Sequence, residues 1–308
     1  MEKTIIQDMG VYQNNHLFIK REDMIPFSFG GNKARKACLF FQEIEKGEYD
    51  CVVTYGTSSS NHCRIIANAC YRRRIPCYII SPQEASEPTF NSQLVEMFDV
   101  HTTIVPVDTV HDTIEKKIVE LKNYGRKPYF IEGGGHGNIG TEAYVHCYEE
   151  ISKQEKELGV YFDYIFLASG TGTTHAGLVC GQLLSGDERK IRGISIARKN
   201  PRGRNIVVDS IRSYIGDKAT EKQIQESTVF IDDYTNGYGK DDRRVLNTIK
   251  DVMKNYGIPL DTTYTGKAFM GMQEYIKSAD IKGKNILFIH TGGTPLFFDT
   301  LKKQSEGI

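Results

Sequence analysis

The sequence lacks an excess of charge of either sign. Its 39 lysine and arginine residues balance 39 aspartate and glutamate residues, so no net field draws the chain toward nucleic acid or an anionic membrane surface. It also lacks an apolar run near the ~20 residues of a spanning helix, and its start, MEKTIIQDMG, has no apolar core of a secretion signal. We therefore expect a cytoplasmic protein that recognises a small ligand, with no nucleic acid or membrane partner.

Disulfide and metal-binding patterns are missing as well. The seven cysteines form an odd set without a C-x-x-C pair, which indicates neither a disulfide framework nor a zinc site. No metal is expected, and there are no repeats or low-complexity tracts. Four histidines lie in predicted turns without carboxylate partners at ligand spacing, so they are expected to make hydrogen bonds instead. These are His62, His136, His175 and His290.

Strand and helix patterns alternate through the chain. At 308 residues with 39% hydrophobic content, it can bury a substantial core, and its length favours two domains. Short apolar, β-branched runs alternate with longer helical stretches, which is typical of an α/β fold with parallel sheets and helices on both faces. The polar segment 199–242 is predicted to be an irregular, mobile connection that contains a helix. The predicted strands are 17–21, 51–55, 76–80, 102–107, 128–131, 164–168, 191–196 and 285–290.

Glycine-rich patches follow several of these strands, at the edge where α/β folds bind ligands. The most prominent is ASGTGTTHAGLVCG, in which Gly170 and Gly172 stand among the hydroxyls of Thr171, Thr173 and Thr174. Backbone N–H groups and hydroxyls beside a helix N-terminus suit a phosphate, although such residues also occur in strand-to-helix turns for backbone reasons alone. Neither a Walker loop nor the dinucleotide fingerprint is present, which favours a monophosphate.

A second turn, TYGTSSSNHCRIIANAC, places Ser58, Ser59, Ser60 and Asn61 at the start of a helix. Free N–H groups there favour an anion such as a substrate carboxylate. A plain helix N-cap, worth about 1 kcal/mol, is the alternative, but one such residue would suffice and four exceed that need. The turns EGGGHGNIGTEAY and HTGGTPLFF complete the set, with Thr291 at the end of the last strand.

The stretch GGNKARK places Lys33 where a loop becomes a helix. A lysine in a partly desolvated pocket can lose its proton and condense with an aldehyde, and pyridoxal phosphate carries both an aldehyde and a monophosphate. Gly30 and Gly31 would then let the backbone approach the ring, and Asn32 would shape the turn. The alternative is that Lys33 and Lys36 belong to a solvated first turn.

Five ordered motifs together resemble a known enzyme family. GGNKARK, SSNHCR, ASGTGTTHAGL, DTTYTGKAFMGM and FIHTGG resemble, in order and separation, the pyridoxal-phosphate enzymes that include D-cysteine desulfhydrase and 1-aminocyclopropane-1-carboxylate deaminase. The resemblance spans about residues 17–298 and implies fold type II, the tryptophan synthase β-like fold. It also implies a homodimer, with pyridoxal 5'-phosphate between a small domain, 36–142, and a large domain made of 1–35 and 143–308.

The resemblance implies a role for each matching residue. Lys33 resembles the Schiff-base lysine, and Lys36 lies near the cofactor phosphate. Ser60 resembles the serine that holds the substrate carboxylate or relays a proton, and Asn61 the residue that bonds the ring hydroxyl. The other expected cofactor contacts are Gly170, Thr171, Gly172, Thr173, Thr174 and Thr291. The other expected substrate contacts are Ser59, His62, Tyr238 and Tyr264, of which the two tyrosines are also candidate catalytic groups.

Two threonines bear on the activity. The deaminase type carries glutamate after the tyrosine and leucine in H-L-G-G, whereas the desulfhydrase type has threonine at both places, as this chain has at Thr265 and Thr291. A carboxylate beside the pyridine nitrogen keeps it protonated and strengthens the electron sink, and a neutral hydroxyl, expected from Thr291, leaves the sink weaker. Opening a cyclopropane is expected to need the stronger sink. We therefore expect α,β-elimination from a small D-amino acid, which gives a 2-oxo acid and ammonia.

Departures from the family pattern leave the substrate open. Ser59 stands where glutamine is usual, Tyr55 and Thr57 are bulkier than usual, and the longer turn GGGHGNIG could project His136 into the substrate space. The Thr-Pro-Leu segment that relatives carry near the start is missing. Ring opening, β-replacement and racemisation stay open as alternatives on the same cofactor. A non-catalytic protein that binds a phosphate ligand is an alternative from another class.

Overall fold

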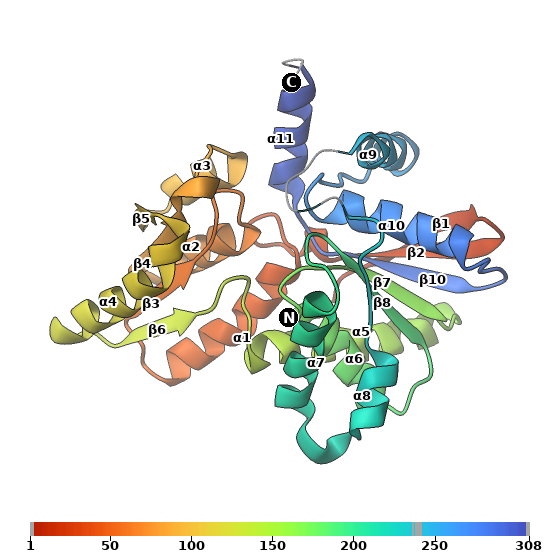
Figure 1. Ribbon diagram of the computed structural model, residues 1–308, viewed down its shortest axis with the longest axis horizontal. Coiled ribbons are helices and arrows are strands. Elements are labelled where there is room, and N and C mark those ends of the chain that lie inside the picture. Colours follow the sequence, from red (N-terminus) through yellow and green to blue (C-terminus); the bar gives the residue numbers. More distant parts are fainter. Residues whose placement is uncertain (1–2, 236, 238–241, 306–308) are drawn as a thin grey trace.

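Two sheets organise the computed structural model, which describes residues 3–235, 237 and 242–305 (Figure 1). The larger sheet has the order β1-β2-β10-β7-β8-β9, and the smaller has the order β5-β4-β3-β6. Every recorded strand pair is parallel except the antiparallel pair β1–β2. The prediction of an α/β fold with two mostly parallel sheets is confirmed.

All eight predicted strands are present, and their ends differ from the prediction by two residues or fewer. The larger sheet contains β1 Ile6–Tyr12, β2 Asn15–Arg21, β7 Tyr164–Ser169, β8 Lys190–Ser195, β9 Val229–Ile231 and β10 Asn285–His290. The smaller sheet contains β3 Cys51–Tyr55, β4 Cys77–Pro82, β5 His101–Val105 and β6 Pro128–Ile131.

Helices fill most of the gaps between the strands. They are α1 Asn32–Lys46, α2 Asn61–Arg73, α3 Phe90–Glu96, α4 Val110–Asn123, α5 Asn138–Leu158, α6 Thr173–Leu184, α7 Arg202–Ile215, α8 Glu221–Ser227, α9 Arg243–Tyr256, α10 Thr265–Ser278 and α11 Thr294–Ser305. In the part of the chain that the structure describes, no helix combines the length and apolar character needed to cross a membrane.

Helices cover both faces of the larger sheet, and β7 shows why its sequence is apolar throughout. Phe166 packs into the core beneath α10 with Phe269, whereas its neighbour Leu167 packs into the opposite core with Val179 of α6. Successive strand side chains point to opposite faces, so a strand buried on both sides needs an unbroken apolar run rather than an alternating one. In the smaller sheet, α1 and α2 share one core with β3, and α4 covers the other face.

The structure contains more regular elements than the sequence predicts. The additional strands are β1 and β9, and the segment predicted to contain one helix contains α7 and α8. β1 forms a hairpin with β2 through Gln13 and Asn14, whose φ values of 49° and 59° suit a two-residue turn. The prediction of a helix within 199–242 is confirmed, but the prediction that the rest is irregular is wrong, because two helices, α7 and α8, and the strand β9 lie in this segment. Polar residues dominate its composition, but Val207 and Ile211 of α7 share one buried stripe.

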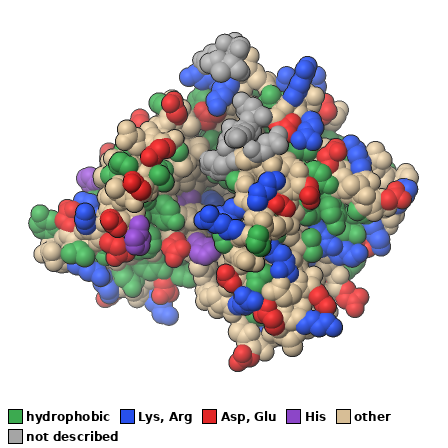
Figure 2. Space-filling view, viewed as in Figure 1, with side chains coloured by type: hydrophobic (Ala, Val, Ile, Leu, Met, Phe, Trp, Pro, Cys, Tyr) green, Lys and Arg blue, Asp and Glu red, His purple; other side chains and the backbone are tan. Residues whose placement is uncertain are grey.

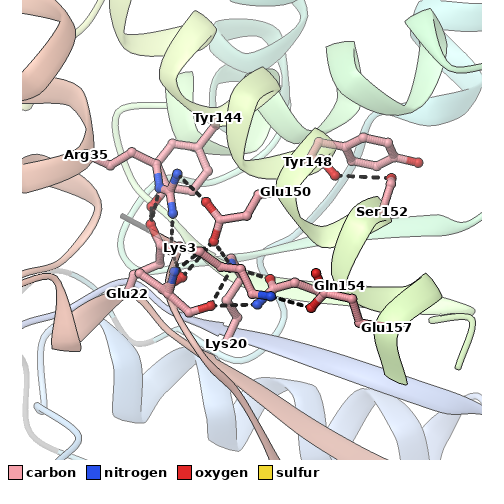
Figure 3. A network of polar contacts seen from close by, with 11 residues as sticks. Lys3, Lys20, Glu22, Arg35, Tyr144, Tyr148, Glu150, Ser152, Gln154 and Glu157 are labelled. Atoms are coloured by element: carbon pink, nitrogen blue, oxygen red, sulfur yellow. Dashed lines mark hydrogen bonds and ion pairs between the residues drawn. The ribbon is translucent and has the colours of Figure 1, made fainter. Parts of the chain in front are cut away.

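A buried polar network holds the start of α1 in place (Figure 3). The Arg35 guanidinium donates to both carboxylate oxygens of Glu22, at 2.5 and 2.7 Å, and to Glu150 at 3.0 Å. Lys20 donates to Glu150 at 2.6 Å. The network therefore ties β2 and the turn after it to α1 and α5, and it lies two residues from Lys33.

Candidate functional site

A cavity of about 450 Å³ lies where the carboxyl ends of strands from both sheets meet. Figure 2 shows the surface hollowed between the two lobes of the molecule. The volume lies within the range typical of small-ligand sites. The lining residues are Asn32, Lys33, Tyr55, Gly56, Thr57, Ser60, Asn61, His62, Gly133, Gly134, Ala168, Ser169, Gly170, Thr171, Gly172, Thr174, His175, Ile196, Ala197, Arg198, Tyr264, Thr291 and Gly292.

Lys33 enters this cavity from the first turn of α1. Its Nζ donates to Gly134 O at 2.8 Å, and burial lowers the pKa of its amine to about 8. Lys36, one turn further along, is buried, and burial lowers its pKa well below the usual value, with the nearby Lys33 adding to the effect. The alternative of a solvated first turn is therefore wrong, and Lys33 is available in part as an uncharged amine.

Paired glycines bring the start of α1 against the last turn of the sheet. Gly31 has φ of 94°, and a Cβ there would lie 2.7 Å from Thr291 O. Gly292 has φ of 100°, and its Cβ would lie 2.7 Å from the Gly31 Cα. Asn32 N donates to Thr291 O at 2.9 Å across this contact. Gly31 and Gly292 thus allow backbone to meet backbone here, and the expected approach of Gly30 and Gly31 to the cofactor ring stays a prediction.

The loop between β7 and α6 is held by both lysine-bearing turns of α1. Lys36 Nζ donates to Thr173 Oγ1 at 2.6 Å, and Asn32 Nδ2 donates to Thr174 Oγ1 at 3.0 Å. Gly172, with φ of 100°, precedes the helix. The first N–H groups of α6 have no intrahelical acceptor. Hydroxyls lie beside them, and Gly170, Thr171, Gly172 and Thr174 line the cavity, whereas Lys36 and Thr173 are not among its lining residues. Such a set of hydroxyls and N–H groups suits a phosphate.

Two side chains from other segments fix the carbonyl groups of the same loop. Arg198, which follows β8, donates to Gly170 O. His136 Nδ1 donates to Thr171 O at 3.2 Å, and His136 is not among the cavity-lining residues. Its predicted projection into the substrate space is therefore not observed. Both loop carbonyls therefore already have donors, and the free N–H groups of the loop and of the start of α6 are what it offers an anion.

The four polar residues at the start of α2, Ser58, Ser59, Ser60 and Asn61, make different contacts. Ser60 is the N-cap, and its Oγ accepts from Cys63 N at 3.1 Å. Ser60 and Asn61 also line the cavity, whereas Ser58 and Ser59 are not among the lining residues. The carbonyl of Ser59 accepts from Asn91 Nδ2 at 2.8 Å. Capping thus explains one hydroxyl of the run, and the pair Ser60 and Asn61 faces the ligand space.

Both cavity-lining histidines are neutral and hydrogen-bonded. Thr54 donates its hydroxyl to Ile131 O at 2.7 Å, so it must accept from His62 Nε2, at 2.8 Å. Burial, with lesser effects of Lys33 and Lys36, lowers the His62 pKa well below its usual value, so its Nδ1 carries no proton. Burial also lowers the His175 pKa to about 3. As predicted, these histidines make hydrogen bonds, His175 through Nδ1 to Ser169 Oγ at 3.4 Å.

Of the two threonines, the structure brings only Thr291 to the cavity wall. The Thr265 hydroxyl donates instead to Asp261 Oδ2 at 2.7 Å, and both residues are fully buried at the start of α10. Tyr264, beside it, lines the cavity. Tyr238 lies outside the described residues. No aspartate or glutamate is among the described lining residues.

Sequence reasoning missed several residues of this site. Arg198 and His175 line the cavity but were not selected as candidates. Arg198 follows a predicted strand, so the strand-end rule could have indicated it. Asn91 is a different case, since it contacts Asn61 from a helix 30 residues away and carries no local signal.

The family model for pyridoxal-phosphate dependent enzymes matches residues 8–292. The chain belongs to this pyridoxal-phosphate-dependent enzyme family. It is an enzyme with pyridoxal phosphate as its cofactor, and the alternative of a non-catalytic phosphate-binding protein is set aside. The fold agrees with fold type II.

Three relatives illustrate the similarity of this pyridoxal-phosphate enzyme to known proteins. A Pyrococcus abyssi protein named "Putative 1-aminocyclopropane-1-carboxylate deaminase" is 32% identical over 301 residues, which cover 96% of this chain and 88% of the relative. A D-cysteine desulfhydrase of Serratia proteamaculans is 29% identical over 303 residues, with 93% and 89% covered. The crystal structure of an ACC deaminase homologue has a TM-score of 0.88 at 28% identity, and the match covers 100% of this chain and 94% of that chain.

The donor set of the cavity fits pyridoxal phosphate. An amine with lowered pKa at Lys33 matches the aldehyde, and the start of α6 with Lys36 matches the phosphate. His175 Nε2 is buried without a hydrogen-bond partner among the described residues, and an unpaired buried nitrogen is costly unless a ligand completes it. No group of three or more potential metal ligands occurs in the described part of the chain.

Proposed function

We propose that this enzyme catalyses α,β-elimination from a small D-amino acid, in the manner of a D-cysteine desulfhydrase. The reaction removes the α-proton and the leaving group on the β-carbon, and hydrolysis then gives a 2-oxo acid and ammonia. Similarity to relatives named D-cysteine desulfhydrase from Serratia proteamaculans and Yersinia enterocolitica supports this assignment.

The observation that carries the proposal is the absence of a carboxylate from the described cavity wall. Thr291 lines the cavity, and Thr265 is bound to Asp261. When bound, pyridoxal phosphate supplies an aldehyde for the substrate amine and an electron-withdrawing ring for the negative charge on its α-carbon. A neutral partner leaves the ring nitrogen less basic than a carboxylate would. A good leaving group then compensates for the weaker sink.

Named side chains supply the other functions. Lys33 would hold the cofactor through its amine, and the free amine, with a pKa of about 8, would be suited to take the α-proton of the substrate. Ser60 donates to the substrate carboxylate at the start of α2, where the helix N-terminus favours negative charge. Tyr264, which lines the cavity, acts on the substrate side. The role expected for Tyr238 stays a prediction, since this residue lies outside the described part of the chain. The phosphate is held by Lys36 and by the loop residues Gly170, Thr171, Gly172, Thr173 and Thr174.

The second candidate is ring opening of 1-aminocyclopropane-1-carboxylate. It is favoured by the name of the Pyrococcus abyssi relative and by the high TM-score with the ACC deaminase homologue. β-Replacement and racemisation begin, like α,β-elimination, with removal of the α-proton, and they differ from it only in the later steps. A described cavity wall without a carboxylate opposes ring opening, because that substrate has no good leaving group.

A substrate panel tests the proposal. Purified holoenzyme is incubated with D- and L-cysteine, D-serine, β-chloro-D-alanine and 1-aminocyclopropane-1-carboxylate, and 2-oxo acid and ammonia are measured with and without an added thiol. We expect oxo acid from the D-amino acids with a β leaving group, unchanged by the thiol, and none from Lys33→Ala. Comparable release from the cyclopropane substrate would favour the deaminase, and a new thioether product would favour replacement.

The domain division and assembly are part of the same proposal. The four strands of the smaller sheet all lie within residues 51–131, which supports a small domain of 36–142 and a large domain of 1–35 with 143–308. The family resemblance implies a homodimer, and we propose a cytoplasmic location. Sedimentation of the purified protein tests the dimer, and cell fractionation tests the compartment.

A further inference from the structure

Asn91 is a fully buried residue at the start of α3 that reaches the ligand-facing turn of α2. In Figure 1, α3 lies beside α2 in the upper left lobe. Asn91 Nδ2 donates to Asn61 Oδ1 at 3.0 Å and to Ser59 O at 2.8 Å, and its Oδ1 accepts from Arg64 Nη1 at 3.1 Å. All the hydrogen-bonding capacity of its NH₂ group is thus directed at the turn that carries Ser60 and Asn61.

Two neighbours determine the orientation of the Asn91 amide independently. A guanidinium has only donors, so the Asn91 group that faces Arg64 must be the carbonyl oxygen. A backbone carbonyl has only acceptors, so the group that faces Ser59 O must be the NH₂. Both requirements select the same orientation, although an asparagine amide considered alone is ambiguous.

The orientation of Asn91 determines that of Asn61. Because the second N–H of Asn91 points at Asn61, the facing atom of Asn61 must be its oxygen. The NH₂ group of Asn61 is then left for the cavity that this residue lines. Asn61 consequently offers the cavity a donor.

Arg64 is an unusual group to find in this place. It is fully buried, and its Nε and Nη2 have no hydrogen-bond partner among the described residues. Burial lowers its pKa to about 9, so the guanidinium still keeps its proton at neutral pH. Burying an arginine is costly. The cost is explained if a group with donors only is needed beside the Asn91 oxygen, which accepts from Arg64.

We propose that Asn91 is a positioning residue that holds the Asn61 side chain with its NH₂ group toward the cavity, where it donates to the ring hydroxylate of the cofactor. This inference rests on the proposed placement of that ring oxygen at Asn61. Asn91 acts through Asn61 without touching the cofactor, and Arg64 in turn orients Asn91 by donating to its oxygen.

The sharpest test replaces the donor by an acceptor of the same shape. In Asn91→Asp the new carboxylate still pairs with Arg64 but can only accept, so Asn61 must turn its NH₂ group toward it and its oxygen toward the ring. We expect holoenzyme that binds pyridoxal phosphate about ten-fold or more weakly. The pH midpoint of the bound cofactor's absorbance should also shift by about one unit.

Asn15→Asp is the matched control. Asn15 is also buried, donates to two carbonyl oxygens, Gln13 O and Ile281 O, and accepts from Lys284 N, but it lies at the amino end of β2, away from the cavity. Asn15→Asp should lose stability without changing the cofactor affinity or the absorbance midpoint. Wild-type affinity and midpoint in Asn91→Asp would overturn the proposal.

Two further measurements keep the test decisive. If Asn91→Asp does not fold, the cofactor affinity and the absorbance midpoint are measured in Asn91→Ala instead. The wild-type chain is also labelled with ¹⁵N-asparagine, so that its side-chain NH₂ signals can be followed. The side-chain NH₂ signals of Asn61 should shift when pyridoxal phosphate binds, and unchanged signals would overturn the proposal. Borohydride reduction of wild-type holoenzyme and peptide mapping test the placement of the cofactor separately, since failure to label Lys33 would contradict the proposed function itself.

Discussion

At the scale of single residues, burial is the main influence on the chemistry of the site. Lys33 has no carboxylate among its recorded hydrogen-bond partners, and desolvation alone lowers the pKa of its amine. The same effect keeps His62 and His175 neutral. The site therefore offers neutral imidazoles and an amine that is neutral in part at neutral pH, which suits nucleophilic attack and proton transfer better than fixed charge does.

The pKa of Lys33 predicts how the apoprotein captures its cofactor. The neutral amine is the reactive form, and at pH ~7.5 a pKa of about 8 leaves roughly a quarter of the molecules neutral, against roughly one in a thousand for an ordinary lysine. The rate of visible-absorbance change on mixing apoprotein with pyridoxal phosphate should rise with pH around a midpoint near 8. Lys33→Ala should give no such change, and a midpoint near 10.5 would contradict the assignment.

Thr265 is predicted to serve stability rather than the reaction. Its hydroxyl donates to Asp261 and accepts from Asp261 N at 3.0 Å. Thr265→Val keeps the shape but leaves the buried Asp261 N without its acceptor and leaves Asp261 Oδ2 with only the Thr265 N donor among the described residues, so it should cost about 1–3 kcal/mol of unfolding free energy in urea titrations. Thr265→Ser keeps the hydroxyl and is the matched control. Equal stability of the valine variant and the wild type would show that the contact is dispensable.

At the scale of elements, α11 connects the larger part of the molecule to α3. Asp299 accepts from Phe90 N at 3.0 Å, and the rings of Phe90 and Phe298 meet edge to face at 6.3 Å. Phe90 is the first residue of α3, so the carboxylate satisfies one of the free N–H groups of that helix. Because Asn91 follows directly, the position of α11 bears on the turn that carries Asn61.

Removal of this contact should loosen α3 specifically. Asp299→Ala is expected to cost about 1 kcal/mol, as the loss of a helix cap does, and to speed amide hydrogen exchange in α3. Asp299→Asn keeps an acceptor oxygen and should stay close to the wild type. If α3 amides exchange at the wild-type rate in Asp299→Ala, the contact does not hold the helix.

At the scale of the whole molecule, the network of Figure 3 joins segments that are distant in sequence. Glu22 and Arg35 are almost completely buried, and Tyr144 also donates to Glu22, at 3.2 Å. A buried ion pair is costly to break, because the remaining charge loses its partner in a low-dielectric environment. The network thus secures the lysine-bearing helix against both β2 and α5.

Arg35→Met is therefore expected to be severely destabilising. The loss should reach about 3–5 kcal/mol in urea unfolding, since Glu22 is left buried and unpaired. Lys222→Met breaks the exposed pair with Glu226, at 3.9 Å, and should change stability by about 0.5 kcal/mol or less. A similar loss in the two variants would mean that the buried network contributes no more than a surface pair.

The sequence by itself determined the eight main strands, the phosphate-type loop before α6 and the position of Lys33. Each of these is written in neighbouring residues as an apolar run, a glycine turn or a helix start. Only the tertiary structure decided that β9 completes the larger sheet and that Asn91 belongs to the site. Those facts depend on contacts between residues far apart in the chain, which leave no period or motif in any local stretch of sequence.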